Sequence, residues 1–344
     1  MEREYQYDNI KFFLIFLVVF GHLLEYISGS ICNNIYRIIY TFHMPVFIFI
    51  TGYFAKFNKK KIIFQLFIPY LLLQTFYIIY DCKYISHTNI SFQFVTPYWI
   101  LWFLLTLIYY YLLIPLIDTD KTINKILFIL GSIVISLFAS ATKNIGYYAS
   151  LHRFFTFLPY FVLGYYFKKS KLKEYFNNNK IRWIIGILAT LFVLLGSLYI
   201  IFNTKYTKYV LYGSFSYNDA YYNMGMKAFI LILGFAWVIF FITIFPKKKL
   251  PFISYIGTNT FYIFILHGFI IKYLGVILKI FIYSEAINIF YAAAIALLLI
   301  IALGNKIIKI ICNYLLNYEW IYNLIIKIKD KLNTQKKQNG CEKT

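Results

Sequence analysis

Ten apolar segments recur along the chain, each about as long as a helix that crosses a bilayer. With a window of about twenty residues, they fall at 10–27, 34–55, 62–80, 98–117, 126–142, 153–167, 183–202, 225–246, 253–274 and 287–311. Lipid offers no partner to a free backbone group, so segments of this length cross as helices. The sequence therefore predicts an all-α integral membrane protein with about ten transmembrane helices. The sixth segment is short, so it could tilt or re-enter instead of crossing fully.

The composition supports the same class and argues against a soluble nucleic-acid-binding protein. Charged residues make up 14% of the chain, whereas a soluble domain carries about a quarter. The net charge is +21, but it is gathered in short loops between the apolar segments, where it reports topology instead. The four cysteines have no metal or redox spacing. We therefore expect no nucleic-acid partner and no metal.

The basic residues also predict the orientation. If both termini are cytoplasmic, most of the 34 lysines and arginines fall in inner loops or in the terminal regions. We expect residues 1–311 to form the membrane domain and residues 312–344 a basic cytoplasmic tail. Apolar side chains in that tail indicate a helix on the membrane surface; they are Trp320, Leu324, Ile325 and Ile328.

Three of the apolar segments contain a histidine, at positions 22, 43 and 267. An ionisable residue inside a span costs roughly 2.5–3.5 kcal/mol on insertion scales, so it usually faces a protein interior or a wet cavity. From the helix rise, His22, His43 and His267 share one level in the outer half of the bilayer. Lys11 precedes His22 by about three turns and lies on its face. The alternative is that these histidines only hydrogen-bond neighbouring helices.

Two charged residues accompany this level. Glu25 follows His22 by three residues, so it could accept the ring N–H, or it could merely reach the outer headgroups. The chain uses 30 lysines and only 4 arginines, which suggests that an arginine at a span edge is kept for its planar fork. Arg153 lies just above the histidine level. His22, Glu25, His43 and Arg153 are therefore the catalytic candidates.

The residues around these positions carry a family resemblance over about the first 270 residues. The chain resembles the membrane-bound acyltransferase-3 family, in particular the fucose 4-O-acetylase and polysaccharide acetyltransferase branch. The stretches that carry it, in family order, are YDNIKFFLIFLVVFGH (Tyr7–His22), FHMPVFIFITGY (Phe42–Tyr53), PYWILWFLLTL (Pro97–Leu107), RFFTFLPYFVLGYY (Arg153–Tyr166), YNDAYYN (Tyr217–Asn223) and GTNTFYIFILHG (Gly257–Gly268).

The resemblance implies a ten-span protein that moves an acyl group, usually acetyl from cytoplasmic acetyl-CoA, onto a carbohydrate hydroxyl. The family hallmark is a basic residue, ten intervening residues and a histidine, which here are Lys11 and His22. Many members have arginine at the first position, so lysine is a departure. His22 would then act as general base or as acyl carrier. The implied setting is the plasma membrane of a bacterium.

Coenzyme A is a large anion, and the inner basic residues could receive it. Lys11, its neighbour Asp8 and the run Lys59, Lys60 and Lys61 are the candidates, although such lysines can also serve topology alone.

The carbohydrate acceptor would meet polar and aromatic side chains on the other side. The loop Asn203–Asn223 suits sugar stacking, but it equally resembles an ordinary interfacial loop. The acceptor-side candidates are Tyr217, Asp219, Tyr221, Asn259 and His267. The acyl group, the acceptor sugar and the oligomeric state stay open, and membrane lipids are the other expected partners. A glycan flippase is the rival function, although the chain has no internal repeat and no midplane carboxylate for ion coupling.

Overall fold

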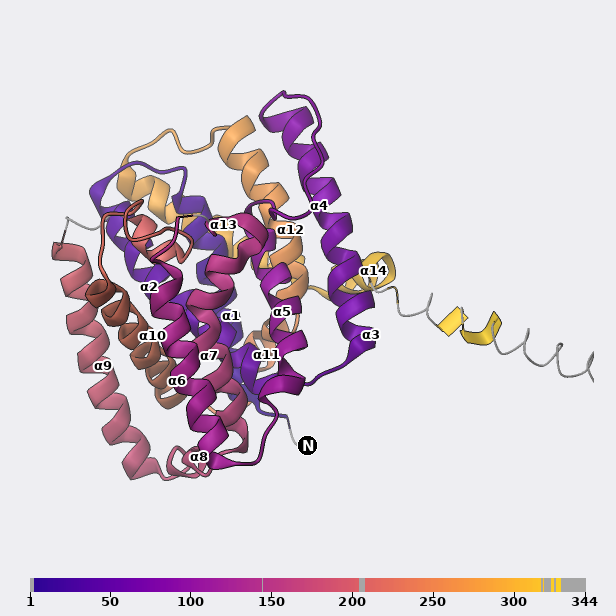
Figure 1. Ribbon diagram of the computed structural model, residues 1–344. Coiled ribbons are helices and arrows are strands. Elements are labelled where there is room, and N and C mark those ends of the chain that lie inside the picture. The colour runs from indigo at the N-terminus through magenta and orange to yellow at the C-terminus, as the bar shows by residue number, and fades with distance from the viewer. Residues whose placement is uncertain are drawn as a thin grey trace, which may run out of the picture.

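The computed structural model describes residues 3–143, 145–203, 208–316, 318, 323, 324 and 326–328. Within these ranges every regular element is a helix (Figure 1). Nine of these helices or helical runs are long and apolar enough to cross a membrane. Six of them are single helices: α1 (Tyr5–Leu24), α2 (Ser30–Phe54), α6 (Thr122–Ala139), α9 (Asn179–Phe202), α10 (Met224–Ile244) and α13 (Glu285–Leu303). The other three are runs of consecutive helices. Lys59–Ile85 contains α3 (Lys59–Lys61), η1 (Ile62–Phe67), α4 (Ile68–Tyr80) and η2 (Asp81–Ile85); Trp99–Ile117 contains η3 (Trp99–Leu101) and α5 (Trp102–Ile117); and Thr260–Ile277 contains α12 (Thr260–Lys272) and η6 (Tyr273–Ile277).

A further long helix, α7 (Leu151–Lys169), corresponds to the short sixth segment. Its 19 residues extend over about 28 Å, so it is long enough to cross. Arg153, Lys168 and Lys169 at its ends lower its mean hydropathy. It packs against α2, α5 and α6 inside the bundle. The prediction of an all-α membrane protein with about ten transmembrane helices is confirmed.

Two glycines let α2 and α7 approach until their backbones touch. A Cβ atom at Gly52 would collide with the carbonyl oxygen of Phe161, and one at Gly164 with that of Phe49. Small residues at such crossings are typical of membrane helices, whose association depends on close packing. This contact fixes α7, and with it Arg153, against α2, which carries His43.

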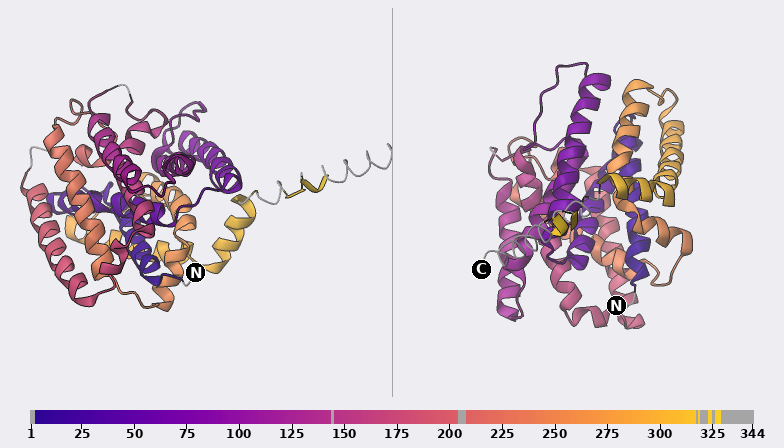
Figure 2. Two further views of the ribbon diagram at one scale, coloured as in Figure 1. Left: turned by 60° about the horizontal axis from the view of Figure 1, so that its bottom comes forward. Right: turned by 90° about the vertical axis from the view of Figure 1, so that its right-hand side faces the viewer.

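The ninth and tenth segments differ from their predicted bounds. The segment 253–274 is broken into α11 (Pro251–Thr258) and α12, because the buried Asn259 between them donates Nδ2–H to the carbonyl of Gly304, 2.8 Å away. The last span ends at Leu303 and not at residue 311. Asn305 Oδ1 then accepts the backbone N–H of Ile308 at 3.0 Å, which starts α14 (Lys306–Leu316) in a new direction (Figure 2).

α1 lies at the centre of the arrangement and packs against α2, α11, α12 and α13. Figure 1 shows α6, α9 and α10 on one side of it and α4, α12 and α14 on the other, while the N-terminus and α8 (Leu172–Tyr175) lie toward one end of the bundle. Trp320 and Ile325 of the predicted surface helix lie outside the described residues. The cytoplasmic location of both termini stays a prediction.

Candidate active site

A cavity of about 750 Å³ runs beside α1. Lys11 and Lys61 line one end of it, and His22, Glu25 and Arg153 line the other. On α1, Lys11 and His22 are separated by about 16 Å of helix. We refer to these as the Lys11 end and the His22 end. The wall between them is largely apolar; it includes Ile15, Val18, Met44, Phe47, Phe103, Leu107 and Phe264.

Glu25 fixes the ring of His22. His22 Nδ1 lies 2.9 Å from Glu25 Oε1, so in the neutral ring Nδ1–H donates to the carboxylate and Nε2 keeps its lone pair. Among the described residues none hydrogen-bonds Nε2. The His22 side chain keeps 15% of its surface exposed, so a molecule in the cavity can reach it. Of the two roles considered for Glu25, contact with His22 is therefore the one that the geometry favours.

Tyrosine hydroxyls complete the surroundings of Glu25. Tyr40 donates to Oε1 at 3.0 Å, and Tyr36 makes a longer contact of 3.4 Å. Tyr36 also donates to the hydroxyl of Tyr212 at 2.7 Å. Burial alone would raise the pKa of Glu25, but His22 and the hydrogen bonds from His22 and Tyr40 outweigh it and hold that pKa below its usual value. Glu25 is thus kept as a carboxylate beside the imidazole.

The other two histidines lie close to His22, as their positions in the spans predict. The rings of His22 and His267 stack with centroids 5.6 Å apart, and Trp99 meets His22 edge-on at 4.8 Å. His267 is fully buried and its Nδ1 bonds the carbonyl of Ile263 at 3.0 Å. His43 lines the cavity, with its Nδ1 2.8 Å from the carbonyl of Ile39. Both rings therefore have one nitrogen occupied by their own helix.

Arg153 lies in the first turn of α7, at the His22 end. Its Nε donates to the carbonyl of Tyr212 at 3.2 Å, and the hydroxyl of the same Tyr212 joins the Tyr36 and Glu25 network. The guanidinium carbon lies 4.8 Å from the ring centroid of Trp102 and 5.1 Å from that of Tyr147. Arg153 is thus connected through one tyrosine to the surroundings of His22.

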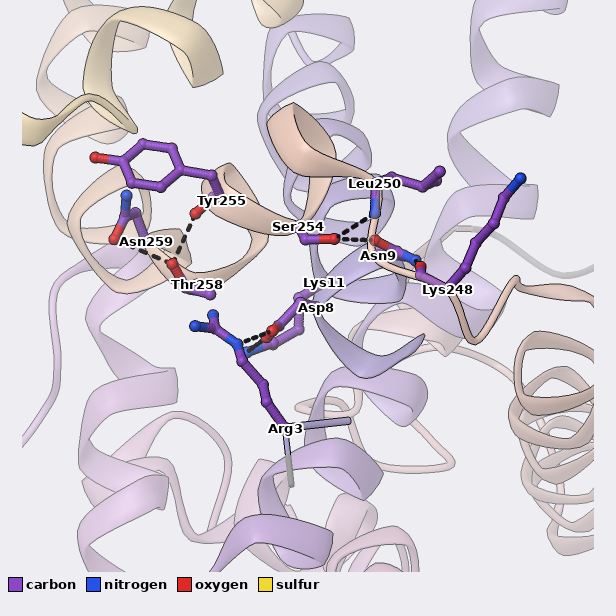
Figure 3. Close-up of polar contacts among 10 residues, drawn as sticks. All are labelled: Arg3, Asp8, Asn9, Lys11, Lys248, Leu250, Ser254, Tyr255, Thr258 and Asn259. Atoms are coloured by element: carbon purple, nitrogen blue, oxygen red, sulfur yellow. Dashed lines mark hydrogen bonds and ion pairs between the residues drawn. The ribbon is translucent and has the colours of Figure 1, made fainter. Parts of the chain in front are cut away.

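At the Lys11 end, α1 and α11 meet through a polar network (Figure 3). Asp8 accepts ion pairs from Lys11 and Arg3, each at 2.8 Å. Asn9 Oδ1 accepts the hydroxyl of Ser254 on α11 at 2.7 Å. Asp8 therefore holds Lys11 in place and does not itself line the cavity. A charged side chain also comes from α3, where Lys61 Nζ lies 3.0 Å from the hydroxyl of Tyr111.

Several predicted site residues lie outside the cavity lining. Lys59 and Lys60 are exposed beside Lys61. Tyr217 donates to the carbonyl of Leu137 at 2.5 Å, and Asp219 Oδ2 accepts the hydroxyl of Ser216 at 2.6 Å. These two contacts fasten the outer loop to α6 and to itself, while Tyr221 is 80% exposed. Asn259 lies between α11 and α12, where its side chain donates to the carbonyl of Gly304.

Most aromatic residues of the His22 end are not among the predicted site residues, although Tyr212 belongs to the loop Asn203–Asn223 that is expected to suit sugar stacking. Tyr36, Tyr40 and His43 follow an i, i+4, i+7 spacing on α2, and this spacing alone predicts that the three side chains share one helical face. Trp99, Trp102, Tyr147 and Tyr212 come from separate elements, and no local pattern connects them. Among the described residues no group of three or more histidine, cysteine, aspartate or glutamate side chains could hold a metal ion.

Comparison with known proteins identifies the family of this chain. A family model described as an acyltransferase domain, acyltransferase-3, matches residues 4–304. The nodulation protein NolL of Sinorhizobium fredii is 28% identical over 190 residues, which cover 49% of this chain and 50% of that protein. NolL of Mesorhizobium japonicum is 29% identical over 122 residues, covering 29% of this chain and 33% of that protein.

The chain thus spans half the length of the first of these curated relatives and a third of the second. No solved structure matches. The family model extends from the first turn of α1 to the end of α13 and includes both ends of the cavity. This integral membrane protein therefore belongs to the acyltransferase-3 family.

Proposed function

We propose that this protein transfers an acetyl group from cytoplasmic acetyl-CoA to a hydroxyl of a cell-surface or lipid-linked carbohydrate. The observation that supports this most is the cavity that Lys11 lines at one end and His22 with Glu25 at the other. In this proposal the donor enters at the Lys11 end and the acceptor at the His22 end. The family match over residues 4–304 supports acyl transfer as the reaction.

The donor fits the cavity in a defined direction. Lys11 and Lys61 attract the phosphates of coenzyme A at their end, each as a point charge. Asp8 offsets part of the charge of Lys11, whereas the ammonium group of Lys61 donates to the neutral hydroxyl of Tyr111 and makes no ion pair among the described residues. The apolar stretch between the two ends suits the pantetheine arm, and the thioester then lies near His22. Asp8, Lys59 and Lys60 act from outside the lining, through their charge.

His22 acts as the general base in this proposal. Its Nε2 takes the proton of the acceptor hydroxyl while the hydroxyl oxygen attacks the thioester carbonyl carbon. The tetrahedral intermediate then collapses, the carbon–sulfur bond breaks, and the imidazolium returns the proton to the departing thiolate. Glu25 stabilises the imidazolium through the 2.9 Å contact with Nδ1. The covalent alternative, in which Nε2 itself carries the acetyl group between two half-reactions, uses the same atoms.

The remaining predicted residues act around this centre. His267 and Trp99 pack against the imidazole and limit its motion. His43 lines the cavity beside Tyr40, and the centroids of their rings lie 4.6 Å apart. Tyr217, Asp219 and Tyr221 belong to the outer loop through which an acceptor would approach. We place the protein in a bacterial plasma membrane, which agrees with the rhizobial source of the relatives. We also expect both termini to lie in the cytoplasm.

Protection of a cavity-lining thiol by acetyl-CoA tests the donor. Asn313 and Leu315 both lie exposed on α14, but only Asn313 lines the Lys11 end. In a variant without the four native cysteines, acetyl-CoA should slow maleimide labelling of Asn313→Cys and leave Leu315→Cys unchanged. Equal labelling rates with and without acetyl-CoA at both positions would contradict the donor site.

Mass spectrometry of surface glycans then tests the reaction. Cells with the protein should carry an acetyl ester that cells with His22→Ala lack, at matched expression. An unchanged ester, together with lipid-linked intermediates that accumulate on one leaflet when the protein is removed, would instead favour the flippase.

A further inference from the structure

Arg153 is a permanent cation at the His22 end, and no described carboxylate pairs with it. The ion pairs of the described residues involve other side chains throughout. The backbone carbonyl of Tyr212 occupies only its Nε. The two terminal nitrogens carry four N–H donors, and these have no hydrogen-bond partner among the described residues. A cation in a membrane cavity without a counter-charge is costly, and an anionic ligand bound at this end would offset that cost.

Glu25 does not pair with Arg153. It is the one carboxylate among the described residues that line the cavity, but its ion pair is with His22 and its hydrogen bonds are with His22, Tyr40 and Tyr36. Lys11 and Lys61 lie at the opposite end, where the phosphates of the donor are placed. This arrangement leaves the terminal N–H groups of Arg153 available to the second substrate.

Two aromatic rings lie beside the guanidinium group of Arg153. The guanidinium carbon lies 4.8 Å from the ring centroid of Trp102 and 5.1 Å from that of Tyr147, and the terminal N–H groups, which have no hydrogen-bond partner among the described residues, are left to a ligand. An edge-on fork matches a carboxylate or a phosphate with two parallel hydrogen bonds. Aromatic rings beside it suit the apolar face of a sugar.

The backbone before Arg153 is also strained in a way that sets its position. Ala149 and Ser150 both adopt left-handed conformations, with φ of 48° and 52°. Such conformations are uncommon for residues with a side chain and persist where the surrounding structure holds them. They place the first turn of α7, with Arg153, against Tyr212.

We propose that the acceptor is an anionic carbohydrate, whose carboxylate or phosphate binds the Arg153 fork while His22 takes the proton from a nearby hydroxyl. This inference rests on the proposed function and adds the charge of the acceptor to it. A uronic acid residue and a sugar phosphate present the same chemistry to the fork. The competing role, in which Arg153 contacts the oxyanion of the intermediate, requires no charge on the acceptor.

Binding of matched sugars to the purified protein in nanodiscs tests this. The probes are methyl β-D-glucuronide, methyl β-D-glucoside, which differs from it only at C6, and glucose 1-phosphate. Tryptophan fluorescence reports binding, because Trp99 and Trp102 line this end of the cavity. We expect the anionic probes to bind about tenfold or more tightly than the glucoside, with a smaller preference at high salt.

Three variants make the result specific. Arg153→Gln should remove the preference, and Arg153→Lys, which keeps the charge and loses the fork, should retain part of it. Arg182→Gln is the matched control, because Arg182 also bonds a backbone carbonyl, that of Phe245 at 2.7 Å, outside the cavity lining. It should keep the full preference. Preference for the glucuronide alone or the phosphate alone identifies the source of the anion.

Three outcomes would contradict an anionic acceptor. Equal affinity for all three probes, no binding by any of them, or a preference that persists in Arg153→Gln overturns the inference. Protection of Asn313→Cys by acetyl-CoA reports separately on the donor site. A protein that shows this protection and no anion preference keeps the proposed function and loses the anionic acceptor.

Discussion

Glu25 Oε1 lies 2.9 Å from Nδ1 of His22, three residues earlier in the chain. α1 ends at Leu24, so the acid sits just beyond the helix that carries the base. The contact selects the tautomer with a free Nε2, and Tyr40 holds the carboxylate from the other side at 3.0 Å. The pair therefore has both elements of an acid-oriented base: a fixed ring and an anion beside it.

Substitution of His22 by alanine should abolish most acetyl transfer. Loss of a general base lowers the rate by about 100- to 10,000-fold, so product should fall by that range while the protein still accumulates in the membrane. Radiolabel transferred from acetyl-CoA to glycan measures it. His87→Ala is the control, since His87 is exposed and outside the cavity lining. Normal product in His22→Ala would contradict the catalytic role.

The Glu25 carboxylate should contribute to stability in a pH-dependent way. Its pKa is held below the usual value of 4.5, so the contribution is fully present above pH 4.5 and is lost as the pH falls through the lowered pKa. Glu25→Gln should therefore unfold at a lower temperature than the unmodified protein at pH 7. Thermal unfolding in detergent should show the difference narrowing below pH 4.5. A difference that grows on acidification would reverse the sign and contradict the assignment.

Tyr40 should act as a positioning residue for Glu25. Tyr40→Phe removes one hydrogen bond to the carboxylate, so kcat should fall by about 2- to 10-fold with little change in KM for acetyl-CoA. Tyr166→Phe is a matched control: its hydroxyl donates to the carbonyl of Ile117 at 2.6 Å, outside the cavity lining. If both variants lose activity equally, the effect is one of packing and not of position.

The fold class could be predicted because its signal is local. Apolar length decides each span separately, so most helix bounds agree to within a few residues. The two failures are at Asn259 and at Gly304, and one hydrogen bond joins them. At Asn259 the helix break is accompanied by a hydrogen bond to Gly304, 45 residues later in the chain. A hydropathy profile carries no information about such a long-range contact.

The candidate site was predictable only where a helix carries it. Lys11 and His22 share α1 and Glu25 caps its C-terminal end, so spacing alone places them relative to one another. Trp102 and Tyr147 reach Arg153 through tertiary packing. The expected acceptor residues have side chains that suit a sugar, but hydrogen bonds such as that of Tyr217 to Leu137 connect them to the scaffold.

Lys61 should contribute more to donor binding than its neighbour Lys59. Both are lysines of α3, but only Lys61 lines the cavity. Lys61→Gln should raise KM for acetyl-CoA by about tenfold, as expected for a lost hydrogen bond between charged groups, and leave kcat nearly unchanged. Lys59→Gln should change KM much less. Equal effects would indicate that the whole run acts only through its general positive charge, and steady-state kinetics in low and high salt would show this.

The contact between α2 and α7 should tolerate no added methyl group. In Gly164→Ala the new Cβ meets the carbonyl oxygen of Phe49, so the helices must separate. Overpacking of this kind costs about 1–3 kcal/mol, which exceeds the gain of up to about 1 kcal/mol from the helix propensity of alanine. Gly131→Ala on α6 is the matched control, because its Cβ would have no neighbour within 4 Å. Thermal unfolding should show Gly164→Ala less stable than the parent protein and Gly131→Ala equally or more stable. Similar stabilities for the two variants would mean that the α2 and α7 backbones are not in contact, and Arg153 would then lose the support that holds it at the His22 end.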